Sequence, residues 1–372
     1  MGLHLIPYDL KIDFVGMRKM AVAFSLALLL VGGGALLFGG GPKYGIDFAG
    51  GTIVQVKFDA PADAEDIKSA LEEMNEPGLV VQRFGEDDGR SYLIRFSGVT
   101  TSSTELREAV SRVLGAKLAG NPVEIQRLEA VGPKVGADLR SKAVEALYFA
   151  TLLIAIYISG RFEQRWFIAA LMAGGIAGSM YALDFVGIPK GLVVLAATGI
   201  MLAMCWKLKL IYALGAVISI LHDVFITVGL FVLMGKEFDL TIIAALLTVL
   251  GYSLNDTIII YDRIRENLQA KRSGTLTELI NRSVNQTLSR TVLTSGTTLF
   301  VVASLLVFGG GIIHDFALVM FIGVIVGTYS SIFVASPVLL LFESTVQEQA
   351  DAARLAREEE AKTERSRGRA LT

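Results

Sequence analysis

Residues 240–261 read LTIIAALLTVLGYSLNDTIIIY and contain a single charged side chain, Asp256. About 20 predominantly apolar residues are enough for an α-helix to cross the hydrocarbon core of a membrane. The whole chain has 372 residues, of which 53% are hydrophobic and only 19% are charged. A soluble globular protein has about 25% charged residues. The sequence therefore predicts an integral membrane protein and argues against a soluble enzyme.

Further apolar runs predict a polytopic α-helical bundle with about eight spans in total. They cover residues 20–40, 143–159, 166–187, 191–206, 210–234, 291–311 and 315–342, and the runs at 143–159 and 191–206 are the shortest. The first run is longer than the apolar core of a cleaved signal peptide and is followed by other spans. We therefore expect it to remain as an anchor.

The distribution of basic residues predicts the orientation, because short cytoplasmic loops of membrane proteins are rich in lysine and arginine. With the N-terminus inside, only Lys190 and Lys236 fall in short outer loops. The inner segments contain Lys11, Arg18, Lys19, Arg161, Arg165, Lys207, Lys209, Arg263, Arg265, Lys271, Arg272, Arg282 and Arg290. We expect residues 1–19 and the charged tail 343–372 in the cytoplasm, and residues 142–342 as the bundle that follows the exported domain.

Residues 41–141 have the pattern of a separate domain outside the membrane. Strands are predicted at 51–58, 79–84, 91–96 and 123–128, helices at 62–75 and 104–118, and a turn at 85–89. The order βαββαβ is typical of a ferredoxin-like α+β domain. No catalytic combination of side chains is evident in it, so we expect a periplasmic handle or docking surface.

Reactive side chains are scarce, and this limits the chemistry of the protein. One cysteine, Cys205, and three histidines are present in the whole chain. An intrachain disulfide is impossible, and neither cysteine nor histidine ligands suffice for a usual metal site. The net charge of −2 gives no basic excess for nucleic acid. We expect no catalytic residues, no cofactor and no metal.

Ionisable side chains inside the spans are the candidate functional groups, because burying them in hydrocarbon is costly. The positions of Asp184, His314 and Asp315, near the outer ends of spans or in an outer loop, favour a solvated role. His222 and Asp223 are adjacent in the middle of a span. For them a buried structural role and a functional role both stay open.

Asp256 and Arg290 form the strongest candidate pair. The helical rise places Asp256 about 25 Å from the outer start of its span, and Arg290 begins the next span from the cytoplasmic side. Asn255 is adjacent to Asp256, and Thr294 and Thr297 continue the helical face of Arg290. A facing arginine favours the charged carboxylate, whereas burial favours the neutral acid. A small rearrangement could then load or release a proton, so the pair predicts a proton pathway.

Several longer motifs carry a resemblance to a known family. They are YGIDFAGGT at 44–52, VGPKVGADLR at 131–140, LHDVFITVG at 221–229, AALLTVLGYSLNDTIIIYDRIREN at 244–267, SRTVLTSGTTL at 289–299, and residues 308–337. In these motifs the chain resembles the SecF branch of the SecD/SecF family of protein-export membrane proteins. The resemblance covers the chain except for 166–209 and the tail.

The resemblance implies half of a resistance–nodulation–division-type permease, with SecD supplying the other half. It implies an accessory role beside the SecY–SecE–SecG channel in the bacterial cytoplasmic (inner) membrane, with YajC as a further partner. The proton motive force would drive late steps in the export of unfolded polypeptides. Protons would be the coupling ion, and sodium stays an alternative.

The resemblance also implies roles for individual residues. Asp256 and Arg290 match the residues on the family's proton path. Asp223 matches the aspartate of the family's His-Asp (HD) motif, and His222 is the histidine before it. Asp47, Gly50 and Gly51 match the motif at the junction of the first span and the exported domain.

Residues 166–209 depart from the family, whose members usually have six spans. The family passes directly from an RFEWR-like loop into the HD span, whereas here RFEQR at 161–165 precedes two further apolar runs. We expect an inserted helix pair that lies at the periphery, packs through Gly174 and Gly178, and has no proton role.

The last span repeats a small-residue spacing at Gly323, Gly327 and Ser331. Small residues let membrane helices approach closely, so we expect close helix packing there.

Three functions remain open at this point. The first is a proton-driven secretion subunit. The second is a proton-coupled small-molecule efflux component, although such pumps have a second half and larger exterior domains in one chain. The third is a passive scaffold for the channel complex, which would conduct no protons.

Overall fold

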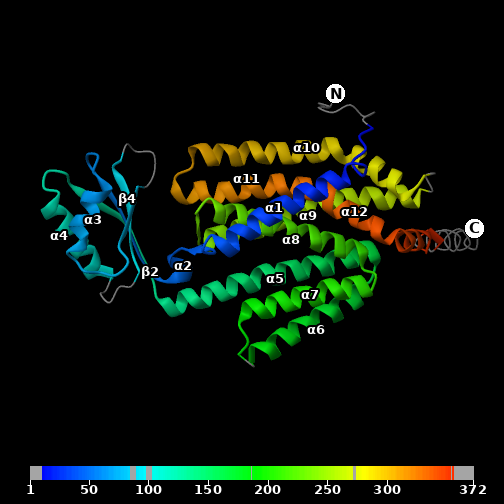
Figure 1. Ribbon diagram of the computed structural model, residues 1–372, viewed down its shortest axis with the longest axis horizontal. Helices are drawn as coiled ribbons and strands as arrows, with labels where there is room; N and C mark the ends of the chain where they lie inside the picture. Colours follow the sequence, from blue (N-terminus) through cyan, green and yellow to red (C-terminus); the bar gives the residue numbers. More distant parts are fainter. Residues whose placement is uncertain are drawn as a thin grey trace, which may run out of the picture.

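The computed structural model describes residues 11–83, 89–97, 103–185, 187–270, 274–352 and 354–355. A bundle of long helices carries a small sheet domain at one end (Figure 1). Most of the turn predicted at 85–89, the side chain of Asp184 and most of the tail lie outside the described residues.

The bundle is built from eight long helices in the described chain. They are α1 (Arg18–Phe38), α5 (Pro133–Glu163), α6 (Trp166–Phe185), α7 (Lys190–Lys207), α8 (Ile211–Leu233), α9 (Leu240–Gln269), α10 (Leu276–Phe308) and α11 (Gly311–Ser330). The chain continues through a π-helical turn (Ser331–Ala335), α12 (Ser336–Val338) and a 3-10 turn (Leu339–Phe342). Seven helical stretches of the described residues are long and apolar enough to cross a membrane, and Trp166–Ala182 in α6 is a shorter apolar helix. These helices support a multi-pass membrane protein.

Helices α9 and α10 extend well beyond the apolar runs that predicted them. The apolar pattern marks only the part of a helix suited to hydrocarbon, whereas a polar helical end can continue into water. A capping box between Thr275 and Glu278 begins α10. The Asn267 amide of α9 donates to the Ser283 hydroxyl of α10 at 2.8 Å, which joins the polar ends of the two helices.

The sheet domain contains four antiparallel strands in the order β3 (Val80–Arg83), β4 (Ser91–Phe96), β2 (Gly51–Phe58) and β5 (Val123–Val131). Helices α3 (Ala64–Glu72) and α4 (Ser103–Lys117) share an apolar core with the strands, which includes Val54, Tyr92 and Leu106. Along the chain the elements follow the order βαββαβ.

A second sheet, of two strands, lies at the junction with the bundle, and no sequence pattern predicts it. Strand β1 (Lys43–Tyr44) pairs in parallel with β6 (Glu237–Phe238), just before α9. Between β1 and β2 lies the short helix α2 (Ile46–Ala49). Two-residue strands have no sequence periodicity, so only the folded chain reveals the pairing.

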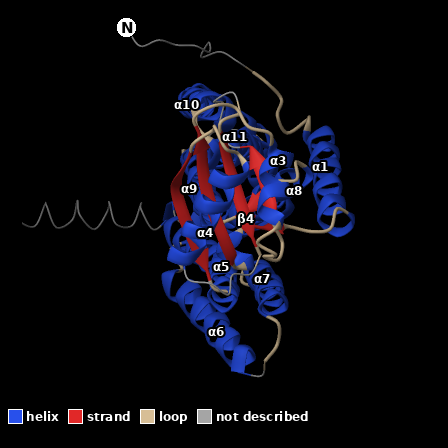
Figure 2. Ribbon diagram, turned by 90° about the vertical axis from the view of Figure 1, so that its left-hand side faces the viewer, coloured by secondary structure: helices blue, strands red, loops and turns tan. Residues whose placement is uncertain are grey.

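The α6–α7 hairpin lies at the edge of the bundle opposite α10 (Figures 1 and 2). The prediction that it packs through Gly174 and Gly178 is wrong. Both glycines are exposed, and a Cβ atom at either position would meet nothing within 4 Å. The hairpin instead packs through larger apolar side chains, such as Met172 and Ile176, because these bury more apolar surface.

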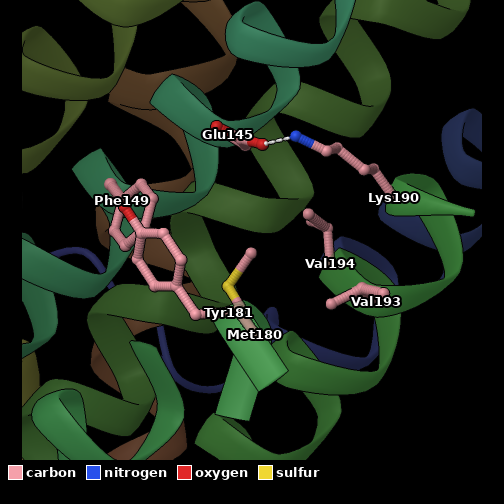
Figure 3. Close-up of a pocket in the computed structure, with 7 residues that line it drawn as sticks. All are labelled: Glu145, Phe149, Met180, Tyr181, Lys190, Val193 and Val194. Atoms are coloured by element: carbon pink, nitrogen blue, oxygen red, sulfur yellow. Dashed lines mark hydrogen bonds and ion pairs between the residues drawn. The ribbon is translucent and has the colours of Figure 1, made fainter. Parts of the chain in front are cut away.

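An ion pair joins the turn between α6 and α7 to α5. Lys190, the first residue of α7, lies 2.5 Å from Glu145 of α5. The pair borders a small cavity of about 110 Å³ that Phe149, Met180 and Val193 also line (Figure 3). Apolar side chains and the partly exposed Lys190–Glu145 ion pair therefore join the hairpin to the bundle.

Candidate functional site

Small residues bring α9 and α11 close together in the middle of the bundle. Gly323 of α11 faces Val249, and a Cβ atom at Gly327 would lie 2.8 Å from the Cβ of Ser253. The prediction of close packing through these glycines is confirmed. The polar side chains that follow on α11 consequently lie against the middle of α9.

Asp223 of α8 is completely buried and accepts hydrogen bonds from neighbouring helices. Its Oδ2 accepts from the Ser253 hydroxyl of α9 at 2.5 Å and from the Ser330 hydroxyl of α11 at 2.8 Å. Its Oδ1 lies 3.0 Å from Nδ1 of His222. Both carboxylate oxygens of Asp223 therefore have partners.

The same network continues to α1. Nε2 of His222 lies 3.0 Å from the Ser25 hydroxyl, which in turn lies 3.0 Å from the hydroxyl of Tyr329. The Tyr329 hydroxyl donates to the Ala21 carbonyl at 2.7 Å, and its ring stacks beside the His222 imidazole. Four helices, α1, α8, α9 and α11, are thus joined by one buried polar network.

Asp256 lies one helical turn beyond Ser253 on α9, and its surroundings differ. The side chain is buried, with 1% of its surface exposed. Its Oδ2 accepts from Ser295 of α10 at 3.2 Å, and Ser295 also lies 2.7 Å from the Thr328 hydroxyl of α11. Its Oδ1 has no hydrogen-bond partner among the described residues. Buried polar atoms nearly always have a partner, so this oxygen marks an incomplete site.

Arg290 of α10 is exposed, and its charge acts on the Asp256 carboxylate without a direct ion pair in the described chain. Thr294 and Thr297 donate to carbonyls of their own helix, at Arg290 and Leu293. The structure does not bring these two threonines to Asp256. Ser295 contacts it instead, because the face that bears Arg290 points away from the bundle.

Further exposed side chains occur on α9 and α10, the two helices that carry Asp256 and Arg290. Asn255 and Thr248 are exposed, although Asp256, adjacent to Asn255, is buried. On α10, Thr297 and Phe300 are exposed as well. We call these residues and Arg290 the open α9–α10 face; it combines polar and apolar side chains.

Sequence reasoning missed the hydroxyl groups of the Asp223 and Asp256 sites. They are Ser25, Ser219, Ser253, Ser295, Thr328, Tyr329 and Ser330. Serine and threonine are frequent in membrane helices and often bond to their own backbone. Ser253 and Ser295 do lie within the motifs GYSLND and TSGTT, which is the one signal that could have found them.

Asp47, Gly50 and Gly51 lie where the sheet domain meets the bundle. Oδ2 of Asp47 accepts from the Leu240 amide at the start of α9, at 3.0 Å. Gly50, at φ 79°, lies against Pro133 at the start of α5, where a Cβ atom would be 2.8 Å from the proline Cα. A side chain at Gly50 would therefore force the domain away from α5.

Two further contacts strengthen this junction. Arg95 of β4 donates to both carboxylate oxygens of Glu237 in β6, with Nη1 and Oε1 separated by 2.6 Å. Asp239 caps α9 through the Ile242 amide at 2.9 Å. Burial raises the pKa of the Asp239 carboxyl, and the nearby charge of Asp47 adds to this shift. The start of α9 thus contacts the sheet domain directly.

Within the described ranges, no group of three or more histidine, cysteine, aspartate or glutamate side chains is arranged to hold a metal ion.

Comparison with known proteins places the chain in a family. The profile of the family described as protein export membrane protein SecD/SecF, C-terminal, matches residues 113–177 and 190–345. The SecD/SecF GG motif matches residues 35–62, which include Gly50 and Gly51. The chain belongs to the SecD/SecF family. The unmatched segment 178–189 lies in the α6–α7 hairpin, so the match includes much of the region that we expected to depart from the family.

Curated relatives agree over most of the chain. The protein translocase subunit SecF of Calditerrivibrio nitroreducens is 37% identical over 348 residues, which cover 92% of this chain and 97% of the relative. That of Magnetococcus marinus is 41% identical over 334 residues, which cover 89% of this chain and 92% of the relative. The resemblance expected from the motifs is therefore confirmed.

Solved structures agree as well. A crystal structure of SecDF, a translocon-associated membrane protein from Thermus thermophilus, is 32% identical, with a TM-score of 0.65 over 92% of this chain. SecDF in the super-membrane-facing form gives a TM-score of 0.55 at 31% identity. This chain spans 40% of the length of the solved SecDF chain in each case.

Proposed function

We propose that this protein is the SecF-type subunit of the Sec translocase and works with a SecD-type half in the export of proteins. The curated relatives are named protein translocase subunits, and the solved SecDF chain is more than twice as long as this one. A separate SecD chain would supply the remainder. The open α9–α10 face offers the polar and apolar surface that such a second half would cover.

The buried Asp256 beside Arg290 supports proton coupling as the driving step. When Asp256 is ionised, its unpartnered Oδ1 can accept from the Arg290 guanidinium. When Asp256 is protonated, that attraction is lost and Arg290 is released. A proton that moves through the field gains about 2.3 kcal/mol per 100 mV. This alternation is the chemistry that a proton-driven subunit requires.

The rigid α9 connects this site to the exported domain. Asp256 lies on the same continuous helix that begins at the contacts of Asp47 and Asp239. A shift of α9 on protonation would therefore reach the sheet domain directly. We propose that the domain moves with it and acts on emerging unfolded polypeptide.

The finer architecture belongs to the same proposal. We propose eight spans, with α6 crossing as well, both termini in the cytoplasm and the protein in the inner membrane. The strand order of the sheet domain is that of a ferredoxin-like fold. SecY–SecE–SecG and YajC are the further partners in this proposal.

The test is proton flux into sealed vesicles that contain this protein with its SecD-type partner. Asp256→Asn and Arg290→Met should abolish proton-dependent export and flux, while the complex still assembles. Asp262→Asn is the matched control for the aspartate, because Asp262 lies at the polar end of α9 in a partly exposed ion pair with Arg161. Arg282→Met, on the exposed polar end of α10, is the control for the arginine.

Full proton-dependent export in either Asp256→Asn or Arg290→Met would contradict the proton pathway. A wild-type complex that supports export but conducts no protons would favour a passive scaffold instead.

A further inference from the structure

A groove opens on the surface of the bundle between α1, α8 and the chain that follows α11. Its volume is about 760 Å³, within the range of about 300–1,000 Å³ that is usual for ligand sites. Apolar side chains such as Val22, Leu29, Ile218 and Phe333 form most of its lining. We call it the α1–α8 groove.

The length of the groove matches one leaflet of a membrane. Its lining on α1 runs from Arg18 to Leu29, which is about 16 Å at the rise of an α-helix. Half of the hydrocarbon core of a bilayer is about 15 Å thick. A groove of this length that begins at the membrane surface would end near the bilayer centre.

One cation lies at the end of the groove where α1 begins. Arg18 is the first residue of α1, and its side chain is exposed and lines the groove. No carboxylate of the described chain lies within ion-pair distance of it. Asp13 is close enough for its charge to act on Arg18, but its oxygen Oδ1 already accepts from Gly16 and Asn281. The guanidinium thus remains available to an anion at the surface.

We propose that the α1–α8 groove binds an anionic phospholipid, with its acyl chains along the apolar walls and its phosphate at Arg18. An arginine recognises phosphate through paired, charge-assisted hydrogen bonds. The charge at one end and the apolar walls beyond it match the two parts of such a lipid.

The lipid would lie against the buried polar network. Ser25 and His222 line the groove and bond to each other, so they offer no free polar group to water. Phe333 and Val334 of the opposite wall belong to the π-helical turn Ser331–Ala335. Such turns occur often at functional sites. A bound acyl chain would cover the His222–Ser25 hydrogen bond on its membrane side.

The test is native mass spectrometry of the full-length protein in detergent micelles, with phosphatidylglycerol and phosphatidylcholine added separately. We expect the wild type to retain one phosphatidylglycerol and to retain phosphatidylcholine more weakly. Arg18→Ala should weaken retention of phosphatidylglycerol about fivefold and weaken retention of phosphatidylcholine less, because choline neutralises the net charge of that lipid. Ile218→Trp, which fills the groove from α8, should abolish retention of both lipids.

Two matched controls should retain phosphatidylglycerol as the wild type does. Lys19→Ala removes the neighbouring cation, which does not line the groove. Leu30→Trp adds the same bulk on α1 outside the groove, at a side chain that is 67% exposed.

Unchanged retention in both Arg18→Ala and Ile218→Trp would overturn the proposal, and so would equal losses in the two controls. A photoreactive group at Leu26, a groove residue, gives a second test in the complex. Cross-links to lipid support the proposal, whereas cross-links to the SecD-type partner would show that a protein fills the groove. These measurements use no proton gradient, so they fail or succeed independently of the proton pathway.

Discussion

The two carboxylates in the middle of the bundle lie next to the same stretch of α9 but have opposite surroundings. Asp223 accepts hydrogen bonds from two serines and contacts His222, and the chain encloses it completely. Asp256, one turn from Ser253, has a single hydrogen bond from Ser295 and one oxygen without a partner in the described structure. The subunit thus completes one polar site by itself and leaves the other incomplete, next to a face that a second protein can cover.

This difference suggests that the two carboxylates have different roles. A buried polar network in which each member is bonded rigidifies a core and specifies its packing. A buried oxygen without a hydrogen-bond partner destabilises the fold by about 1–3 kcal/mol. Such an oxygen is therefore expected mainly where the group must change its bonding during function. We therefore propose that Asp223 and His222 hold the helices in place, and that Asp256 carries the proton.

The largest effect on stability is expected at Asp223, whose two carboxylate oxygens both have partners. Asp223→Ala removes the partner of three buried groups, and each buried polar group left without its partner costs about 1–3 kcal/mol. Asp256→Ala removes one hydrogen bond, and Ser295 keeps Thr328 as a partner. Its cost should be about 1 kcal/mol. Thermal unfolding of the two purified variants in the same detergent measures this difference, and equal losses would remove the distinction between the sites.

The next largest effect tests the helix contact that brings the two sites together. Gly327→Leu places a side chain against Ser253, where even a Cβ atom is too close, so α9 and α11 must move apart. Overpacking of this kind costs about 1–3 kcal/mol. Gly178→Leu is the matched control, because that glycine of α6 has open space beside it. A comparable loss of thermal stability in the control would show that the glycine contact has no special role.

A smaller effect is expected at the α6–α7 hairpin, far from both carboxylates. Glu145→Gln weakens the partly exposed ion pair with Lys190, and such pairs contribute about 0–1 kcal/mol. Proton flux should stay at the wild-type level, since the hairpin lies at the opposite edge from α10 (Figures 1 and 2). Loss of flux in this variant would show that the hairpin takes part in proton movement.

The smallest effect concerns pH and the segment that precedes α1. The Gly16 amide and then the Asn281 side chain hold the pKa of Asp13 below its usual range. The ionised form is the bonded form, so this contact is present above the ordinary aspartate value of about 3.9 and is lost as the pH falls through the lower folded value. Hydrogen exchange at Gly16 should quicken only in acid, whereas Asp13→Asn should remove that dependence. Persistence of the pH dependence in Asp13→Asn would assign it to another group.

The sequence predicted the long spans well because apolar length is a local signal. Residues 240–261 alone indicate most of the part of α9 suited to a membrane, and Gly323 and Gly327 correctly indicated close packing. The same small-residue pattern failed at Gly174 and Gly178, because spacing does not say which face of a helix is covered. The neighbouring Met172 and Ile176 form that contact.

The candidate site was only partly predictable for a similar reason. Asp223 and Asp256 were identifiable because a carboxylate in an apolar run is conspicuous. Nothing in the sequence showed that Asp223 has a partner for each oxygen whereas Asp256 does not. The partners Ser253, Ser295 and Ser330 come from different helices. Their hydroxyls acquire a role only once α8, α9, α10 and α11 are assembled.

The accessibility of the two carboxylates tests the central distinction most directly. An apolar carbodiimide modifies protonated carboxyl groups that it can reach inside a membrane protein, and peptide mass spectrometry identifies the modified residue. We predict that Asp256 of the isolated subunit is modified, that the SecD-type partner protects it, and that Asp223 is unmodified in both cases. Modification of Asp223 to the same extent as Asp256, or an unreactive Asp256 in the isolated subunit, would contradict the account.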